Sequence, residues 1–461
     1  MAHSHETLST QQSYSEATPP RKEARALAAA RAVLDDVFGP AAARPFAVRF
    51  WEGTVDEPAE APRFTIVLES PGSLRRMLLP PTELALTESY LFGDVDIEGD
   101  IEAAAVLGDL AASRLRSPRT WLRLARHVLA LPRDQKNSAD KTETVTAHLA
   151  GRRHSRRRDR EAVRFHYNVG NPFYALWLDA RMVYSCAYFV HESDDLERAQ
   201  ESKLDLICRK LRLRPGERLL DIGCGWGGLI MHAARRYGVF ALGITLSDAQ
   251  AELARQRIDT AGLTDRCKVE LRDYRELPKD SGFEPFDKIA SVGMVEHVGQ
   301  KRIDDYFAAA HASLRPGGLF LNHGIVSIAG SRPESLASRV LGRLWQRGEF
   351  IDRYVFPDGE LLPAATVVAS AEGKGFELRD VESLREHYLL TLRHWVGRLQ
   401  SREREAIALV GETTYRVWRL YMSASAHGFR IGRIGIIQSL LAKPHADGRV
   451  ELPRTRADIY G

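Results

Sequence analysis

The chain is poor in cysteine, with four in 461 residues, at Cys186, Cys208, Cys224 and Cys267, and no two of them form a C-x-x-C pair. This scarcity argues against a disulfide framework and against a cysteine-based metal site, so we expect no metal and a reducing environment. Long apolar runs are also missing, since no segment approaches the roughly 18 residues that span a bilayer. The polar first 20 residues do not resemble a signal peptide. We therefore expect a cytoplasmic protein.

A strong net charge is absent as well, because 65 Lys and Arg residues face 61 Asp and Glu residues. The charge is nevertheless uneven, with six arginines in the nine residues 152–160. Such a run attracts nucleic acid, an acidic partner or anionic lipid headgroups, but it is equally well explained as a solvated linker. The arginine run by itself decides nothing.

The length of the chain predicts two domains. Helical spacing at 24–38, strand-like patterns at 46–51 and 64–68, and helices ending near 131 indicate a small α+β domain. We expect the following organisation: a disordered tail at 1–24, an N-terminal accessory domain at 25–131, a basic linker at 132–160, a catalytic domain at 161–445 and a C-terminal tail at 446–461.

Strands and helices alternate regularly in the larger domain. The expected strands are 218–223, 240–245, 268–272, 286–290 and 319–323, and the expected helices between them are 229–237, 247–260 and 303–314. This alternation predicts an α/β fold with a parallel sheet and helices on both faces.

A glycine-rich loop, Asp221-Ile-Gly-Cys-Gly-Trp-Gly-Gly228, directly follows the first of these strands. Its glycines let the backbone approach a ligand closely and expose amides at a helix start. The spacing is G-x-G-x-G, not the G-x-G-x-x-G of dinucleotide enzymes. It resembles the first motif of class I methyltransferases, which bind S-adenosylmethionine. A purely structural turn is the alternative, and the strand–turn–helix context favours cofactor binding.

Two further segments bear on this site. The second strand ends without an acidic residue at the usual ribose position, and Asp248 is adequately explained as a helix-terminal charge. Asp273 and Tyr274 follow the third strand, where the adenine edge is commonly bound. The segment Asn171-Pro-Phe-Tyr174 is similar to the N-P-P-Y/F motif of base amino-methyltransferases, but it lacks the second proline and precedes the glycine loop. We therefore expect no nucleic-acid substrate.

Six segments together resemble the cyclopropane fatty acid synthase family, which includes the mycolic acid cyclopropane synthases. They are Phe165-His-Tyr-Asn-Val-Gly-Asn171, Met182-Val-Tyr-Ser-Cys-Ala-Tyr188, the loop 221–227, Gly243-Ile-Thr-Leu-Ser247, Ser291-Val-Gly-Met-Val-Glu-His-Val298 and Phe429-Arg-Ile-Gly-Arg-Ile-Gly435. The resemblance covers about 161–445, and more loosely 84–99. It implies a Rossmann-like class I fold and transfer of a methyl(ene) group from S-adenosylmethionine to the cis double bond of unsaturated phospholipid acyl chains. Cyclopropane fatty acids would form through a carbocation that bound bicarbonate deprotonates.

The resemblance also assigns residues. The bicarbonate ligands would be the backbone of Cys186, the side chains of Glu296 and His323, the backbone of Ile325, and Tyr388. The cofactor contacts would be Tyr184, Ser185, Asp221, Gly223, Cys224, Gly225, Gly227, Thr245, Leu246, Ser247, Gln250, Tyr274 and Arg275. Several of these residue types, such as a buried cysteine, histidine or tyrosine, are equally common in an ordinary core. Asn168, Val183 and Gly324 depart from the family pattern, which bears on acyl-chain preference and on the fate of the cation.

A lipid substrate implies a visit to the membrane. We expect peripheral association with its inner face through anionic headgroups, using the arginine run and a basic C-terminal surface of Arg416, Arg419, Arg430 and Arg433. The resemblance suggests that the N-terminal domain mediates the formation of a homodimer and takes part in contact with the membrane. Three alternatives stay open: a methylene- or methyl-branched product, a non-catalytic lipid- or S-adenosylmethionine-binding protein, and a nucleic-acid methyltransferase.

Overall fold

The computed structural model describes residues 21–460 with gaps. The gaps are 81, 115–117, 134–145, 147–148, 150, 152, 168, 280–281 and 329–347. Most of the expected N-terminal tail, Arg152 and Asn168 therefore lie outside the described residues. Helix α1 (Arg21–Phe38) begins within the last residues of that expected tail. Across the described ranges, every helix is too short or too polar to cross a bilayer.

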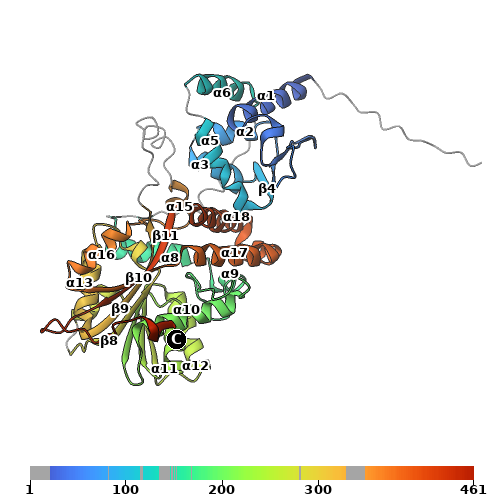
Figure 1. Cartoon of the computed structure of the whole chain (residues 1–461). Helices are drawn as coiled ribbons and strands as arrows, with labels where there is room; N and C mark the ends of the chain where they lie inside the picture. The colour runs from blue at the N-terminus through green and yellow to red at the C-terminus, as the bar shows by residue number, and fades with distance from the viewer. Residues whose placement is uncertain are drawn as a thin grey trace, which may run out of the picture.

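The larger domain is built on a seven-stranded sheet with the strand order β10-β11-β9-β8-β5-β6-β7 (Figure 1). Its strands are β5 (Arg218–Ile222), β6 (Phe240–Thr245), β7 (Cys267–Leu271), β8 (Phe286–Val292), β9 (Leu314–Ser327), β10 (Glu377–Ser383) and β11 (Ile434–Ala442). The first five are parallel and are the five expected strands, so the predicted α/β fold is confirmed. β10 and β11 are antiparallel additions that the sequence analysis did not predict.

Helices cover both faces of this sheet because side chains alternate along each strand. Leu219 of β5 packs with one set of helices, α10 (Leu196–Leu211), α11 (Gly228–Tyr237) and α12 (Asp248–Thr260). Its neighbour Leu220 packs with the other set, α13 (Ile303–Ser313) and α16 (Ala364–Glu372). A strand buried on both sides reads as a nearly continuous apolar run, and this explains why the central strands were visible in the sequence.

The N-terminal domain is the expected α+β unit, with its own core. Its sheet has the order β2-β1-β3-β4, with strands β1 (Ala47–Arg49), β2 (Val55–Asp56), β3 (Phe64–Leu68) and β4 (Val95–Gly99). Its further helices are α2 (Ser73–Leu78), α3 (Glu83–Leu91), α4 (Ile101–Ala104), α5 (Val106–Arg114) and α6 (Pro118–Ala130). Phe46 stacks on Phe64 with ring centroids 5.2 Å apart. This core is separate from that of the larger domain.

Two helices, α17 (Arg385–Ser401) and α18 (Glu403–Arg430), lie between the sheet and the N-terminal domain (Figure 1). The arginines expected to form a free basic surface are used at this domain boundary. Arg433 pairs with Asp109 at 2.7 Å, and Arg430 pairs with Glu102 at 3.3 Å. In the same way Arg416 contacts Asp96 and Arg419 contacts the Tyr90 hydroxyl, at 3.2 Å and 2.9 Å. Arg416 and Arg419 are therefore largely buried at the domain boundary, whereas the side chains of Arg430 and Arg433 stay 39% and 36% exposed, so the four arginines do not form one free basic surface.

The ends of the larger domain also differ from expectation. Helix α8 (Arg156–Tyr167) begins inside the expected linker. Arg153 and Arg158 of the basic run both bind Asp358, at 2.7 Å and 2.5 Å. The expected C-terminal tail carries helix α19 (Ala457–Tyr460), whose Ile459 is buried. Both segments therefore pack as parts of the larger domain.

Candidate active site

A pocket lies at the carboxyl ends of the parallel strands, where β5 turns into α11. Gly223, Gly225 and Gly227 have φ angles of +84°, +53° and +80°, which favour glycine. A Cβ built at Gly225 would meet no atom within 4 Å, so the backbone there borders open space. This loop can therefore cradle a ligand, as an open α/β sheet commonly does at this edge.

Most of the predicted cofactor residues line this pocket. They are Tyr184, Ser185, Asp221, Gly223, Cys224, Gly225, Thr245, Leu246, Gln250, Tyr274 and Arg275. Gly227 and Ser247 do not line it. Gly227 is the N-cap of α11, and the Ser247 hydroxyl caps α12 by accepting from Gln250 N–H at 3.3 Å. These two residues shape the pocket through the helix starts instead of lining it.

Other pocket residues were missed in the sequence. Asp159, from the expected linker, pairs with Arg275 at 3.0 Å, and Arg275 also binds Asp273. Tyr167, Lys203 and Arg302 line the pocket as well. A sequence signal existed for Tyr167, which lies within one of the family-like segments, but a single lysine or aspartate in an amphipathic helix gives none.

A second, larger cavity of about 780 Å³ adjoins the first. The two share five lining residues, Tyr167, Tyr184, Ser185, Gly293 and His297, and therefore lie side by side. All five predicted catalytic residues, Cys186, Glu296, His323, Ile325 and Tyr388, line the larger cavity. Residues of the N-terminal domain, among them Leu86, Gly108 and Trp121, also line it. The structure thus brings the predicted groups together at the junction between a cofactor pocket and a long cavity bounded by both domains.

Glu296 follows β8 in a short 3-10 turn, Val295–His297. Its Oε1 accepts a hydrogen bond from Ile325 N–H at 2.6 Å, and its Oε2 is buried with no partner among the described residues. Burial raises the pKa of this carboxyl to about 7. An unpaired buried oxygen in a cavity indicates a polar ligand.

His323 lies fully buried in β9, and its ring orientation is fixed by a chain of polar contacts. Lys210 donates to Gln438 Oε1 at 2.8 Å, which leaves the Gln438 amide nitrogen to donate to His323 Nδ1 at 3.0 Å. Burial holds the pKa of His323 well below its usual value, so the ring is neutral. A neutral ring that accepts at Nδ1 carries its proton on Nε2. That atom is buried without a partner in the described part of the chain, and it can donate to a ligand in the cavity.

The remaining predicted ligands differ in whether their polar groups are still available to form a hydrogen bond with a bound molecule. The predicted ligand at Cys186 is its backbone; the thiol itself donates to Ala187 O at 3.2 Å, and burial raises its pKa, so the side chain is a packed neutral group. The Ile325 N–H is already paired with Glu296, which makes it a support for the carboxylate. Tyr388 in α17 has its ring against Phe429, with centroids 4.8 Å apart, and burial holds its pKa well above the usual value. It therefore offers a neutral hydroxyl.

One departure from the family pattern has a local explanation. A Cβ built at Gly324 would overlap Cγ1 of Val295, so any side chain there would collide with that valine. Glycine at 324 is thus tied to the valine that precedes Glu296.

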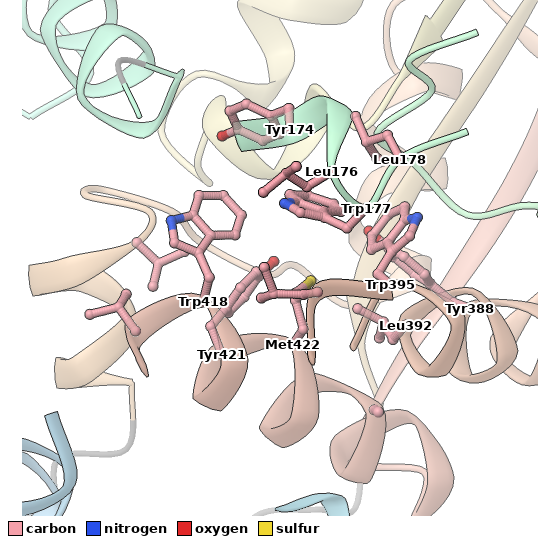
Figure 2. Packing of buried hydrophobic residues seen from close by; sticks show 14 of the residues in the cluster. Tyr174, Leu176, Trp177, Leu178, Tyr388, Leu392, Trp395, Trp418, Tyr421 and Met422 are labelled. Atoms are coloured by element: carbon pink, nitrogen blue, oxygen red, sulfur yellow. The ribbon is translucent and has the colours of Figure 1, made fainter. Parts of the chain in front are cut away.

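Aromatic rings line the larger cavity, among them those of Tyr167, Tyr184, Phe356, Tyr388, Tyr421 and Phe429, and further aromatic rings of the core pack behind them. Figure 2 shows Tyr388 and Trp395 from α17 and Trp418 and Tyr421 from α18 facing Tyr174 and Trp177. The rings of Tyr184 and Trp395 are 5.2 Å apart. Aromatic faces attract a nearby cation, and the surrounding apolar packing excludes water. The arrangement suits a reaction in which positive charge develops on an apolar substrate.

Comparison with known proteins identifies the family. A sequence model described as mycolic acid cyclopropane synthetase matches residues 154–439, and one described as a domain of unknown function (DUF7884) matches residues 33–111. A probable fatty acid methyltransferase of Pseudomonas putida is 41% identical over 90% of this chain and 96% of its own length. The cyclopropane-fatty-acyl-phospholipid synthase of Escherichia coli (strain K12) is 37% identical over 61% of this chain and 68% of its own.

A solved structure agrees with these matches. The crystal structure of mycolic acid cyclopropane synthase CmaA1 complexed with SAH and CTAB is 35% identical, with a TM-score of 0.57 over 61% of this chain and 97% of that one. The buried Asp221 Oδ1 without a partner among the described residues and the open space beside Gly225 fit a cofactor with polar ends at the glycine loop. The chain therefore belongs to the mycolic acid cyclopropane synthetase family and is a methyltransferase that uses S-adenosylmethionine.

Proposed function

We propose that the protein transfers a methyl group to the cis double bond of an unsaturated phospholipid acyl chain and closes a cyclopropane ring, with bicarbonate as the base. The observation that carries the proposal is the pair of buried atoms without partners in the described part of the chain, Glu296 Oε2 and His323 Nε2, in an apolar cavity next to the cofactor pocket. A small ligand that both accepts and donates hydrogen bonds fits such a pair, and bicarbonate does both.

In this proposal the cavity, the aromatic residues and the polar side chains have separate roles. The cavity holds the acyl chain and excludes water, and the aromatic walls stabilise positive charge on the reacting carbons. When bound, S-adenosylmethionine would supply an electrophilic methyl group and bicarbonate would supply the base for the proton released on ring closure. His323 Nε2–H and the Tyr388 hydroxyl donate to the anion, while Glu296 accepts from its hydroxyl and is itself held by Ile325 N–H. Preorganised donors of this kind need no reorganisation during the reaction.

The direct test incubates the purified protein with methyl-labelled S-adenosylmethionine and vesicles of unsaturated phospholipid, and identifies the fatty acids by mass spectrometry. We expect a cyclopropane product. Its yield should fall in carbonate-free buffer and recover when bicarbonate is added. A cyclopropane product indifferent to bicarbonate would overturn the base but keep the reaction. A lack of labelled lipid would leave the non-catalytic binding alternative.

A second candidate is a methylene- or methyl-branched product from the same cation. The Pseudomonas putida relative, which matches nearly the whole chain, is named a probable fatty acid methyltransferase. In that reaction a hydride shift moves the positive charge to the methylated carbon and loss of a proton gives the methylene-branched chain, while a saturated methyl-branched chain would need a two-electron reductant in addition. Nuclear magnetic resonance of the labelled product separates the two outcomes, because only the ring gives cyclopropane methylene signals.

Gln438→Glu is expected to lower turnover by roughly 10- to 100-fold, because a positioned hydrogen-bonding group commonly contributes that much. A carboxylate at 438 can accept from Lys210 but cannot donate to His323 Nδ1, so the ring would move its proton to Nδ1. The check is turnover on phospholipid vesicles alongside calorimetric binding of S-adenosylhomocysteine, which should not change. Ser439→Ala, on the neighbouring residue, is the control. Wild-type turnover of the Gln438→Glu variant would contradict the assigned tautomer.

We also propose that the protein associates peripherally with anionic membranes, through helix α6. Leu122 and Leu129 on this helix are 75% and 60% exposed, while Leu124 and Val128 are buried in the N-terminal core. Arg119 and Arg126 are exposed beside the two leucines and have no partner among the described residues. An exposed apolar stripe flanked by arginines is typical of helices that lie in the lipid headgroup region. Trp121 of the same helix lines the large cavity, which supports the proposal because a lipid surface bound by α6 would then lie close to the cavity.

Replacing Leu122 and Leu129 together by Glu is expected to weaken binding to anionic vesicles by at least about tenfold, because burying a leucine contributes roughly 1.5–3 kcal/mol. Sedimentation with phosphatidylglycerol vesicles measures the effect. Leu409→Glu is the matched control, since Leu409 is 51% exposed on α18. Unchanged sedimentation of the double variant would exclude this surface.

A further inference from the structure

A row of polar side chains crosses the sheet behind His323. In the register of β10, β11 and β9, Glu382 lies opposite Gln438, and Gln438 lies opposite His323. Side chains of directly opposite residues point to the same face of a sheet. Lys210 of α10 covers this row, and it is buried together with Gln438 and His323, while Glu382 at the edge strand is partly exposed. The surrounding core is apolar, so the buried members of the row must satisfy one another.

Lys210 sets the direction of the hydrogen bonds in this row. Its Nζ donates to Glu382 Oε2 and, at 2.8 Å, to Gln438 Oε1. An ammonium group has donors only, whereas an amide can turn either its oxygen or its nitrogen toward a neighbour. The Gln438 oxygen therefore faces Lys210, and its nitrogen donates to His323 Nδ1 at 3.0 Å. The orientation of the amide follows from the lysine beside it.

The charge of Lys210 is compensated on the outer side of the row. Burial lowers the pKa of Lys210, and Glu382 is the first of the groups that oppose this change. Asp380 and Arg456 also act on the lysine, but they form an ion pair with each other. Burial first, and then lysine charges that include Lys210, hold the pKa of His323 well below its usual value. Lys210 thus helps to keep the ring neutral as well as oriented.

The outer end of the row is held by the C-terminal segment. The Tyr460 hydroxyl donates to Glu382 Oε2 at 3.0 Å. Arg212 binds both oxygens of Asp458, at 2.7 Å and 3.2 Å, and Ile459 is buried, so α19 is fixed beside α10. Tyr460 lies outside residues 154–439, which the family model matches. The row therefore continues into a part of the chain that the family resemblance does not cover.

We propose that Lys210 is a positioning residue for the reaction. It orients the Gln438 amide and thereby keeps the proton of His323 on Nε2, and Glu382 and Tyr460 hold it in place. The inference rests on the proposed function, in which His323 Nε2–H donates to the bound anion. Without the ammonium group, the Gln438 nitrogen could donate to Glu382, and its oxygen could accept from His323 Nδ1–H. The ring would then have no proton on the nitrogen that meets the anion.

Nitrogen-15 nuclear magnetic resonance of histidine-labelled protein tests this directly, because protonated and unprotonated ring nitrogens have well-separated chemical shifts. The His323→Gln variant identifies the signals of this ring. We expect the proton on Nε2 in the wild-type protein and on Nδ1 in Lys210→Met. Lys288→Met is the matched control, since Lys288 is also buried and lies 3.9 Å from a carboxylate oxygen of Glu217. It should leave the His323 signals unchanged.

Turnover on phospholipid vesicles gives a second readout. Lys210→Met should lower turnover by roughly 10- to 100-fold, the usual contribution of a positioned hydrogen-bonding group, and leave binding of S-adenosylhomocysteine unchanged. Gln438→Leu should cause a loss of similar size. Adding Lys210→Met to Gln438→Leu should cause no further loss, because residues that act through one another are not additive. Two independent structural effects would instead multiply. Thermal melting checks that each variant is folded.

The outcomes separate this inference from the proposed function. A wild-type ring with its proton on Nδ1 overturns the inference without any variant, which covers the case of a variant that does not fold. An unchanged tautomer in Lys210→Met, or losses that multiply in the double variant, would show that Lys210 only supports the core. Failure of the wild-type protein to transfer a methyl group to lipid would contradict the proposed function, and the resonance experiment alone would then decide whether Lys210 sets the tautomer.

Discussion

Glu296→Gln is expected to lower methyl transfer into lipid by roughly 10²- to 10³-fold, the loss commonly seen when one preorganised polar group of an active site is removed. The amide can still accept from Ile325 N–H through its oxygen, so the local turn is retained. It then presents an NH₂ group where Oε2 faces the cavity, and this group cannot accept from a bicarbonate hydroxyl. The effect should appear in turnover and not in the fold.

Three measurements isolate this effect. Turnover is followed with labelled S-adenosylmethionine and unsaturated phospholipid vesicles, binding of S-adenosylhomocysteine by calorimetry, and stability by thermal melting. Only turnover should change. Glu284→Gln, on a side chain that is 79% exposed, controls for loss of a carboxylate as such. Turnover above about a tenth of wild type would remove Glu296 from the anion site, since a smaller loss is within the range of indirect effects.

Gly108→Trp is expected to lower turnover on phospholipid by roughly 10- to 100-fold, because misplacing a substrate by about 1 Å can cost that much. Gly108 lies in α5 of the N-terminal domain and lines the cavity of about 780 Å³. A Cβ built there would meet no atom within 4 Å, so a large side chain has room and fills the cavity instead of disrupting the helix. S-adenosylhomocysteine binding should be unchanged, since the cofactor pocket is bounded by other residues.

The control for this variant is Gly108→Ala, which should keep activity and stabilise α5 by about 0.5–1 kcal/mol through helix propensity. Wild-type turnover of Gly108→Trp would show that the acyl chain does not reach the part of the cavity formed by the N-terminal domain. The comparison matters because CmaA1 matches only 61% of this chain while 97% of its own length is covered. The wall formed by the N-terminal domain is therefore a feature that this chain has in addition.

Much of the site was predictable because it is local in sequence. The glycine loop and the strand before it occupy consecutive residues, and their apolar, glycine-rich pattern follows from burial on both faces of a parallel sheet. Glu296 was visible for a similar reason, since it follows the buried strand β8 directly. In contrast, β10 was missed because an edge strand with the sequence Glu-Leu-Arg-Asp-Val-Glu-Ser carries little apolar signal.

The sequence by itself determined the positions of the five parallel strands along the chain, the cofactor loop and the residue types that converge on the proposed anion site. Tertiary structure alone decided which of these groups are free to act. It placed Gln438 against His323, which selects the ring tautomer, and it placed Lys210 against Gln438. It also brought Asp109 to Arg433, which turned an expected membrane-facing charge into a domain contact. The physical reason is that pairing and desolvation set the charge and the hydrogen-bonding capacity of a polar group, and both depend on neighbours far away in the sequence.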